Sequence, residues 1–213
     1  MTEKKKRGRP KANRQIDKNA LLNIAIEEFA KNGFEGAKQK EIARKAGIAN
    51  SLMNYHFQNK DDLWRQAVSQ LGLKLEKRFE DVGVVLKDLN GVSALKAYTR
   101  QFIYFSAEHP EFHRIVFHEM CTQTERADWL IENIMTPLHN LYLKNADRTS
   151  TAHLAVNGIP VANISSIIGG ASSTFFLYAH QIKKMYDVDP FEKSQIEKHA
   201  DIVIELIFNS LKS

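Results

Sequence analysis

Residues 38–60 read KQKEIARKAGIANSLMNYHFQNK, and this stretch decides the fold. Its first part predicts a short helix over 38–46 that ends at Gly47, the residue best able to take a left-handed conformation. A second short helix is expected from about Asn50 to His56. Two short helices joined by so tight a turn have the proportions of a helix-turn-helix.

Helical patterns extend from this stretch to both sides. Upstream, Asp17 can cap a helix whose apolar residues recur at helical spacing as far as Phe29, with Gly33 as its natural end. Downstream, helices are expected over 61–86, 92–108, 111–122, 127–144, 163–186 and 190–211, with a polar connection at 145–160. No alternating strand pattern occurs in the sequence. The predicted fold class is therefore all-α, with a three-helix head over 16–60 carried on a larger helical body over 61–213.

The excess positive charge lies at the N-terminal end. Residues 1–65 carry 15 Lys and Arg against 8 Asp and Glu, a net of +7, whereas residues 66–213 carry 15 against 17, a net of −2. The first 15 residues are basic and poor in helix formers, so we expect a flexible arm over 1–15. One basic end on a nearly neutral body is the electrostatic footprint of a module that binds a polyanion.

Composition also bounds the compartment. Cys121 is the only cysteine of the sequence, so no internal disulfide can form and a reducing, intracellular compartment is inferred. The basic N-terminus is not followed by an apolar segment, which argues against secretion. The charge-free stretch 149–182 contains Pro160 and several serines, and we interpret it as a buried helix rather than a membrane span. The expected location is the cytoplasm, in association with the nucleoid.

From Asp17 to Leu63 the chain resembles the TetR/AcrR family of bacterial transcriptional regulators. The residues that carry the resemblance are, in chain order, Ala25, Phe29, Gly33-Phe34, Glu41-Ile42-Ala43, Ala46-Gly47-Ile48, Tyr55-His56-Phe57, Lys60 and Leu63. The resemblance implies a ligand-responsive repressor that binds a palindromic DNA operator as a homodimer. It also implies that a small-molecule effector releases the DNA. Such an effector must bind the conformation that cannot bind DNA more tightly than the DNA-binding one, since only a difference in affinity can shift the equilibrium. We expect no enzymatic activity and no cofactor.

The expected recognition helix presents small and polar side chains to base edges, as a helix that fills the major groove must. This reading face is Asn50, Ser51, Asn54 and Tyr55, and either asparagine could pair with an adenine. Contacts to the DNA backbone are expected from helix starts and from the polar groups beside them. The residues predicted to make them are Lys38, Gln39, Tyr55, His56 and Lys60.

The arm contains Arg7-Gly8-Arg9-Pro10, which looks like an AT-hook. Arg7 and Arg9 would then enter a narrow A·T-rich minor groove, where the negative potential is strongest. The alternative is a solvated basic tail. Beside a helix-turn-helix, the minor-groove interpretation is favoured.

Aromatic and sulfur-containing side chains gather on the middle helices of the body. In the family the corresponding helices enclose an effector pocket, so the resemblance implies candidates for its lining. These candidates are Phe102, Phe105, His113, Phe117, Met120 and Trp129. An aromatic stripe at helical spacing is also typical of plain core packing, and the sequence leaves both interpretations open.

The last two expected helices carry apolar stripes that predict a homodimer. The stripe residues are Ile164, Ile167, Ile168, Ala171, Phe175 and Tyr178, followed by Ile196, Val203, Leu206 and Ile207. A body of this size cannot easily hide both stripes, so they are expected to pair across a twofold axis as a four-helix bundle. Such a dimer sets two recognition helices against successive major grooves, which requires an approximately palindromic operator.

Other functional classes fit the sequence less well. His109, His113 and His118 invite a metal site, but no Cys or acidic partner shows a recognised zinc spacing, so no metal is expected. The sequence has no phosphate-binding loop, nucleophile elbow or metalloprotease motif. The alternatives to a ligand-released repressor are an effector-independent architectural DNA-binding protein and, less favoured, a helical enzyme.

Overall fold

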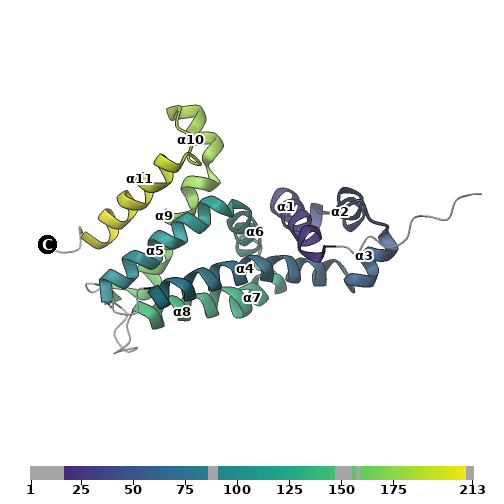
Figure 1. The fold of residues 1–213 in the computed structure, drawn as a ribbon, viewed down its shortest axis with the longest axis horizontal. Coiled ribbons are helices and arrows are strands. Elements are labelled where there is room, and N and C mark those ends of the chain that lie inside the picture. Colours follow the sequence, from purple (N-terminus) through teal and green to yellow (C-terminus); the bar gives the residue numbers. More distant parts are fainter. Residues whose placement is uncertain (1–16, 86–90, 147–154, 157–158, 210–213) are drawn as a thin grey trace, which may run out of the picture.

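The computed structural model describes residues 17–85, 91–146, 155–156 and 159–209, and the described chain is built almost wholly of helices (Figure 1). The head lies at one end of an elongated molecule and consists of α1 (Lys18–Gly36), α2 (Gln39–Lys45) and α3 (Asn50–His56). The long helix α4 (Lys60–Val85) leads from the head into the body. The predicted all-α class is confirmed.

In the residues that the structure describes, the body continues through seven further α-helices. These are α5 (Gly91–Glu108), α6 (Pro110–Met120), α7 (Glu125–Leu130), α8 (Thr136–Ala146), α9 (Val161–Leu177), α10 (Ala179–Tyr186) and α11 (Lys193–Ile204). Two π-helical turns, η1 (Ile131–Met135) and η2 (Glu205–Asn209), extend α7 into α8 and prolong α11. The short strands β1 (Ala155–Val156) and β2 (Ile159–Pro160) pair antiparallel ahead of α9.

Local signals in the sequence set the limits of the first helix. The Asp17 carboxylate accepts hydrogen bonds from the backbone N–H groups of Asn19 (2.9 Å) and Ala20 (3.4 Å), which would otherwise have no partner in the first turn. Gly33 interrupts the regular helix with φ of +66°, as its position predicts. The chain does not leave the helix there, however, and a further turn carries it to Gly36.

The turn between α2 and α3 is the one that the sequence predicts. The N–H of Gly47 donates to the carbonyl of Arg44 (3.1 Å), and the N–H of Ile48 donates to the carbonyl of Ala43 (3.0 Å). Gly47 has φ of +67°, so these two bonds form the Schellman ending that favours glycine. The helix-turn-helix is thus closed by its own backbone.

Two hydrophobic cores organise the rest of the chain. The larger core joins the head to the adjacent part of the body, because α1 packs against both α4 and α6 and brings Phe29 into one cluster with Trp64 and Phe105. The second core lies where α5 packs against α9 and α11, around Ile103 and Phe176. The head therefore does not fold over a core of its own but shares one with the body. No helix of the described ranges is long and apolar enough to cross a membrane.

Two helix predictions at the C-terminal end need correction. The helix expected over 163–186 is broken at Tyr178, whose φ of −96° and ψ of 21° leave the helical region between α9 and α10. Neither Gly nor Pro stands at this break, so the local sequence does not announce it. The helix expected over 190–211 begins at Lys193 and widens into the π-helical turn η2 after Ile204.

Candidate nucleic-acid interface and ligand cavity

Helix α3 presents a polar ridge to solvent. Asn50, Ser51, Asn54 and Tyr55 are all exposed, whereas Met53 on the opposite side of the helix is fully buried. The Tyr55 side chain is 81% exposed, which is unusual for an aromatic ring and leaves most of the ring and its hydroxyl accessible to a partner. The structure therefore brings together the four residues of the predicted reading face.

The ridge rests on a well-packed base. Phe57, directly after α3, is fully buried, and the Lys18 ammonium of α1 lies 5.7 Å from the centre of its ring. Helices α1 and α2 are joined by an ion pair between Lys45 and the buried carboxylate of Glu28, which also accepts a hydrogen bond from the Asn32 side chain at 3.3 Å. This charge-assisted pair holds α1 and α2 together, while the contact of Lys18 with Phe57 joins α1 to the end of α3.

The cationic and polar side chains of the head differ in their exposure and in their contacts within the protein. Lys38 is exposed at the start of α2, beside Gln39, whose side-chain amide nitrogen is buried without a hydrogen-bond partner in the described part of the chain. His56 is half-buried against Tyr55. Lys60 is engaged within the molecule, because its ammonium donates to the carbonyl of Glu35 (3.3 Å) and burial lowers its pKa. Arg7 and Arg9 lie outside the described residues.

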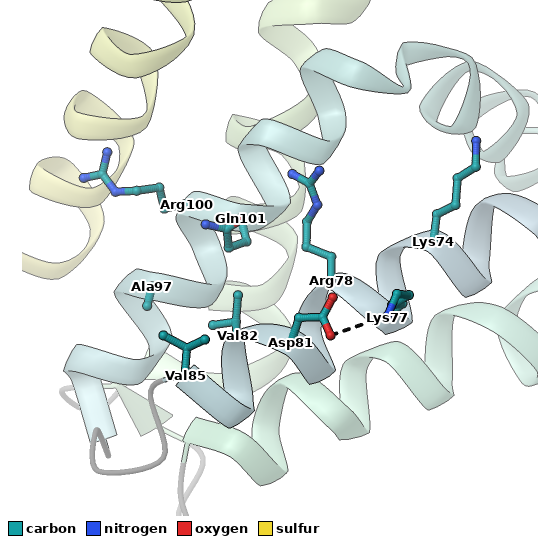
Figure 2. A pocket seen from close by; sticks show the side chains of 9 residues that line it. All are labelled: Lys74, Lys77, Arg78, Asp81, Val82, Val85, Ala97, Arg100 and Gln101. Carbon is teal, nitrogen blue, oxygen red and sulfur yellow. Dashed lines mark ion pairs between the residues drawn. The ribbon is translucent and has the colours of Figure 1, made fainter.

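The body has an open groove between α4 and α5, with a volume of about 760 Å³ (Figure 2). Most of its cations are already paired with carboxylates. Arg78 pairs with Glu108 at 2.5 Å, and Lys77 pairs with Asp81 at 3.6 Å. The Arg100 side chain reaches toward α11, where it pairs with Asp201 at 2.7 Å. Only two helices form the walls of this groove, so it does not enclose a small molecule.

A second cavity, of about 370 Å³, is lined by side chains from many elements. Helices α4, α5, α6, α8 and α9 and the turn η1 all contribute side chains to its wall. The lining residues are Leu75, Phe79, Phe102, Phe112, Met135, Leu138, His139, Tyr142, Ser165, Ser166, Ile168 and Gly169. None of these lining residues is an Asp, Glu, Lys or Arg, and the volume is within the range of pockets that bind small molecules.

The polar groups of this cavity are neutral at physiological pH. Burial raises the pKa of Tyr142 to about 12, and the Tyr142 hydroxyl is hydrogen-bonded to that of Thr99 at 3.2 Å. Burial also lowers the pKa of His139, which keeps the imidazole uncharged. Ser166 donates to the carbonyl of Ala162 at 2.7 Å and retains acceptor capacity. The cavity is thus apolar with a few neutral hydrogen-bonding groups.

The six predicted pocket residues are scattered by the structure. Only Phe102 lines the cavity, while Phe105 is buried in the larger core and Phe117 is 58% exposed. Met120 and Trp129 pack against the larger core, away from the cavity wall. The aromatic stripe on α5 and α6 is divided between core and surface, because adjacent turns of a helix meet different neighbours.

His113 lies directly behind the cavity wall. Its ring packs edge to face against Phe102 at 5.5 Å and Phe112 at 5.4 Å, and both phenylalanines line the cavity. Burial lowers the pKa of His113 to about 4, and its Nε2 has no hydrogen-bond partner among the described residues. The sequence pattern missed Phe112, Tyr142 and the serines of α9, although the first two belong to the aromatic stripe.

Part of the predicted dimer stripe is buried within the protomer. Four of its residues lie buried in the second core: Ile164, Ile168, Val203 and Ile207. Ala171 and Phe175 are half-buried against the same core. Tyr178, Leu206 and Ile167 of the stripe remain exposed, together with Ile202, which the stripe does not include. Within the described part of the chain, residues 161–209 hold seven of the fifteen exposed large apolar side chains, so an apolar surface does exist here.

The three histidines considered for a metal lie in separate surroundings. His109 pairs with Glu111 at 3.0 Å, and His113 is enclosed by aromatic rings. The His118 ring is beside Gly33 of α1. The described residues contain no group of three or more His, Cys, Asp or Glu side chains that could hold a metal ion.

Comparisons with known proteins agree with this geometry. Residues 21–67 match the sequence model of the bacterial regulatory proteins of the tetR family. The HTH-type transcriptional regulator RutR of Escherichia coli K12 is 27% identical over 103 residues, 48% of this chain and 47% of RutR. The chain therefore matches about half the length of this relative. The fatty acid metabolism regulator protein of Bacillus subtilis 168 is 29% identical over 63 residues, 29% of this chain and 32% of that protein.

The fold likeness extends over nearly the whole chain. A solved structure of a proposed fatty acid metabolism regulator from Clostridium perfringens superposes with a TM-score of 0.68 at 20% identity. The superposition covers 89% of this chain and 97% of that one, so head and body share the arrangement of that protein. The head thus matches the sequence model of the tetR family over residues 21–67, and the chain as a whole shares its fold with this solved structure.

Proposed function

We propose that this protein is a dimeric, ligand-responsive repressor that binds a palindromic DNA operator and is released from it by a small molecule. The observation that carries the proposal is the exposed polar ridge of α3 on a fully buried base, at the basic end of the chain. A helix of this composition reads bases in the major groove. A DNA-binding regulator acts where the chromosome is, so we place the protein in the cytoplasm, on the nucleoid.

The reading face consists of Asn50, Ser51, Asn54 and Tyr55. One of the asparagines pairs with an adenine, a contact worth about 1–3 kcal/mol of discrimination. The DNA backbone is contacted by Lys38, Gln39, Tyr55 and His56. Lys60 contributes through its charge beside the DNA rather than by direct contact, since its ammonium is held by Glu35 and Phe34. Arg7 and Arg9 add contacts in the minor groove.

The dimer forms through the exposed apolar side chains of the C-terminal helices. Ile167, Tyr178, Ile202 and Leu206 are the anchors, since the other half of the predicted stripe is buried within the protomer. Pairing through one patch on both copies gives twofold symmetry. The two recognition helices then face successive major grooves of a palindromic site.

The effector binds in the 370 Å³ cavity. Two relatives are named for fatty acid metabolism, which agrees with an apolar ligand. The cavity lining contains no cation to pair with a carboxylate or a phosphate, however, and an unpaired buried charge is costly. We therefore propose an uncharged, mainly apolar molecule that hydrogen-bonds to His139, Tyr142 or the serines of α9. This molecule releases the DNA because it binds the conformation that cannot bind DNA more tightly than the conformation that can.

Duplexes selected from a random pool test the DNA-reading proposal. The full-length protein should enrich palindromic sites, and the Asn54→Ala/Tyr55→Ala variant should bind cognate and random duplexes with equal affinity while keeping its helical circular-dichroism spectrum. Gln58→Ala, just outside the ridge and also exposed, serves as the matched control and should retain the preference. An unchanged ratio of cognate to random affinity in the double variant would contradict the reading face.

Thermal-shift screening with uncharged aromatic and aliphatic compounds tests the effector proposal. A compound that stabilises the protein should also weaken its binding to the selected duplex. If no compound does both, an architectural DNA-binding protein without an effector becomes the better description.

A further inference from the structure

Cations and aromatic rings cluster where the head meets the body. The ring of Phe34, near the end of α1, has the guanidinium carbon of Arg126 at 3.6 Å from its centre and the ammonium of Lys60 at 4.5 Å. Arg126 belongs to α7 of the body, whereas Lys60 begins α4. Cations held this close to a ring face, with partial burial, are bound by its quadrupole.

The kink at Gly33 creates this contact. Positive φ at Gly33 turns the last residues of α1 out of the regular helix and places Phe34 edge to face against Trp64 at 6.4 Å. The neighbouring Glu35 makes two further contacts. Its carbonyl accepts from Lys60 at 3.3 Å, and its carboxylate lies 3.6 Å from the Arg126 guanidinium. The end of α1 is thus held from two different helices of the body.

Arg126 itself is firmly anchored on the body side. Its Nε lies 3.3 Å from the buried carboxylate of Glu119, and its side chain is only 17% exposed. Thr124 donates to the same carboxylate at 2.7 Å while it caps α7 through the N–H of Ala127. A guanidinium with a planar fork, fixed in this way, can hold a ring and a carboxylate in one geometry.

The segment that carries Arg126 also forms a wall of the cavity. Helix α7 runs without a gap through η1 into α8, so one helical segment extends from Glu125 to Ala146. Met135, Leu138, His139 and Tyr142 of this segment line the cavity. A molecule that displaces these side chains therefore displaces the helix on which Arg126 is anchored, because packed helices move as units.

We propose, resting on the function proposed above, that Arg126 is a positioning residue that sets the angle of the reading head on the body and links this angle to the cavity. Helix α4 connects head and body through the chain itself. The packing of α1 on α6 within the larger core is a second attachment. Arg126 adds a third, through α7, which fixes the end of α1 beyond the Gly33 kink by its contacts with Phe34 and Glu35.

Two DNA probes separate positioning from a general loss of stability. The first is a duplex with two half-sites, obtained by selection, and the second is the same duplex with one half-site scrambled. Head orientation matters only when two heads must bind in register. Arg126→Ala should therefore bind the two-half-site duplex about tenfold more weakly, in line with one lost cation–π contact, and the single half-site nearly as well as the wild type.

Arg65→Ala is the matched control. Arg65 lies in the same cluster, 5.2 Å from the Trp129 ring, but its ion pair with Asp61 stays within α4. This variant loses the same charge without releasing α1, so it should bind both duplexes like the wild type. Removal of Arg126 leaves Glu119 buried without its cation, and the Glu119→Gln/Arg126→Ala variant removes that charge in case the single variant folds poorly.

Tryptophan fluorescence reports on the same junction. Trp64 and Trp129 are the only two tryptophans of the chain, and their rings meet at 5.7 Å within this cluster. Emission of the wild type should shift when the two-half-site duplex binds, and Arg126→Ala should lose that shift while Arg65→Ala keeps one. Equal losses of affinity on both duplexes, or wild-type binding by Arg126→Ala, would overturn the proposal.

A wild type that binds the two duplexes equally would contradict the dimer, not the role of Arg126. In that case tryptophan emission tests the role of Arg126. A wild-type emission spectrum that is the same with and without DNA would overturn the positioning role as well.

Discussion

The head and the body turn their polar residues in opposite directions. On α3 the apolar Met53 lies inside and the polar Asn50 and Asn54 face solvent. On α9 Ser165 lines the 370 Å³ cavity, while Ile167 is exposed. The head is thus built to meet a hydrated polyanion at its surface. The body instead has an apolar cavity between its helices and an apolar surface on its C-terminal helices.

The two regions also differ in how completely they are packed. The base of the head is filled by side chains that are fully buried, such as Phe57, whereas the body leaves a cavity between six elements. In a densely packed region the displacement of one side chain moves its neighbours, whereas side chains around a cavity have room to move separately. Four measurements test this contrast in packing.

Removal of a ring from the head should have the largest effect. Phe57→Ala leaves a hole beneath α3 and should lower the free energy of unfolding by about 3–5 kcal/mol. Phe117→Ala removes the same ring from an exposed site of the body and should change it by less than about 0.5 kcal/mol. Urea unfolding of both variants makes the comparison. Similar losses would contradict the contrast in packing.

Acid should destabilise the body through His113. Burial lowers its pKa from 6.5 to about 4, so the unfolded chain binds the proton more tightly than the folded chain. The stability contributed by the neutral imidazole is present above pH 6.5 and is lost as the pH falls toward 4, by up to about 3 kcal/mol. His113→Leu should flatten the dependence of unfolding free energy on pH within this window. A variant whose curve runs parallel to that of the wild type would exclude His113 as the cause.

Adjacent isoleucines on α9 should respond in different ways to the same substitution. Ile167→Arg with Leu206→Arg places charges on the exposed apolar surface and should raise the dimer dissociation constant at least about a hundredfold while the protomer stays folded. Ile168→Arg buries an unpaired charge in the second core and should unfold the body instead. Sedimentation and circular dichroism distinguish the outcomes. An intact dimer in the first variant would place the interface elsewhere.

Two helical glycines should show the smallest effect and a difference in sign. A Cβ at Gly169 meets no atom within 4 Å, so Gly169→Ala should stabilise the protein by about 0.5–1 kcal/mol through helix propensity. A Cβ at Gly72 would lie 3.0 Å from two carbons of Ile134, and Gly72→Ala should therefore be destabilising. Thermal unfolding measures both. Equal gains would show that the body near Gly72 is less tightly packed than the structure indicates.

The sequence by itself determined the head. Asp17, Gly33, Gly47 and the alternation of Met53 with exposed polar neighbours are local signals, and each acts through hydrogen bonds or backbone angles within a few residues. The exposed polar side of α3 follows from these signals alone. Most helix limits of the body were also predicted within a few residues, because hydrophobic periodicity is a property of each helix taken separately.

Only the tertiary structure decided which side of each body helix meets which neighbour. Periodicity identifies an apolar side but not its partner, so Ile168 was expected at a dimer interface and lies beside the cavity, and Phe117 was expected in a pocket and faces solvent. The contact of Arg126 with Phe34 joins residues far apart in the chain and was beyond any local pattern. Such pairings depend on the packing of all the helices at once, because burial is shared among surfaces that no single segment contains.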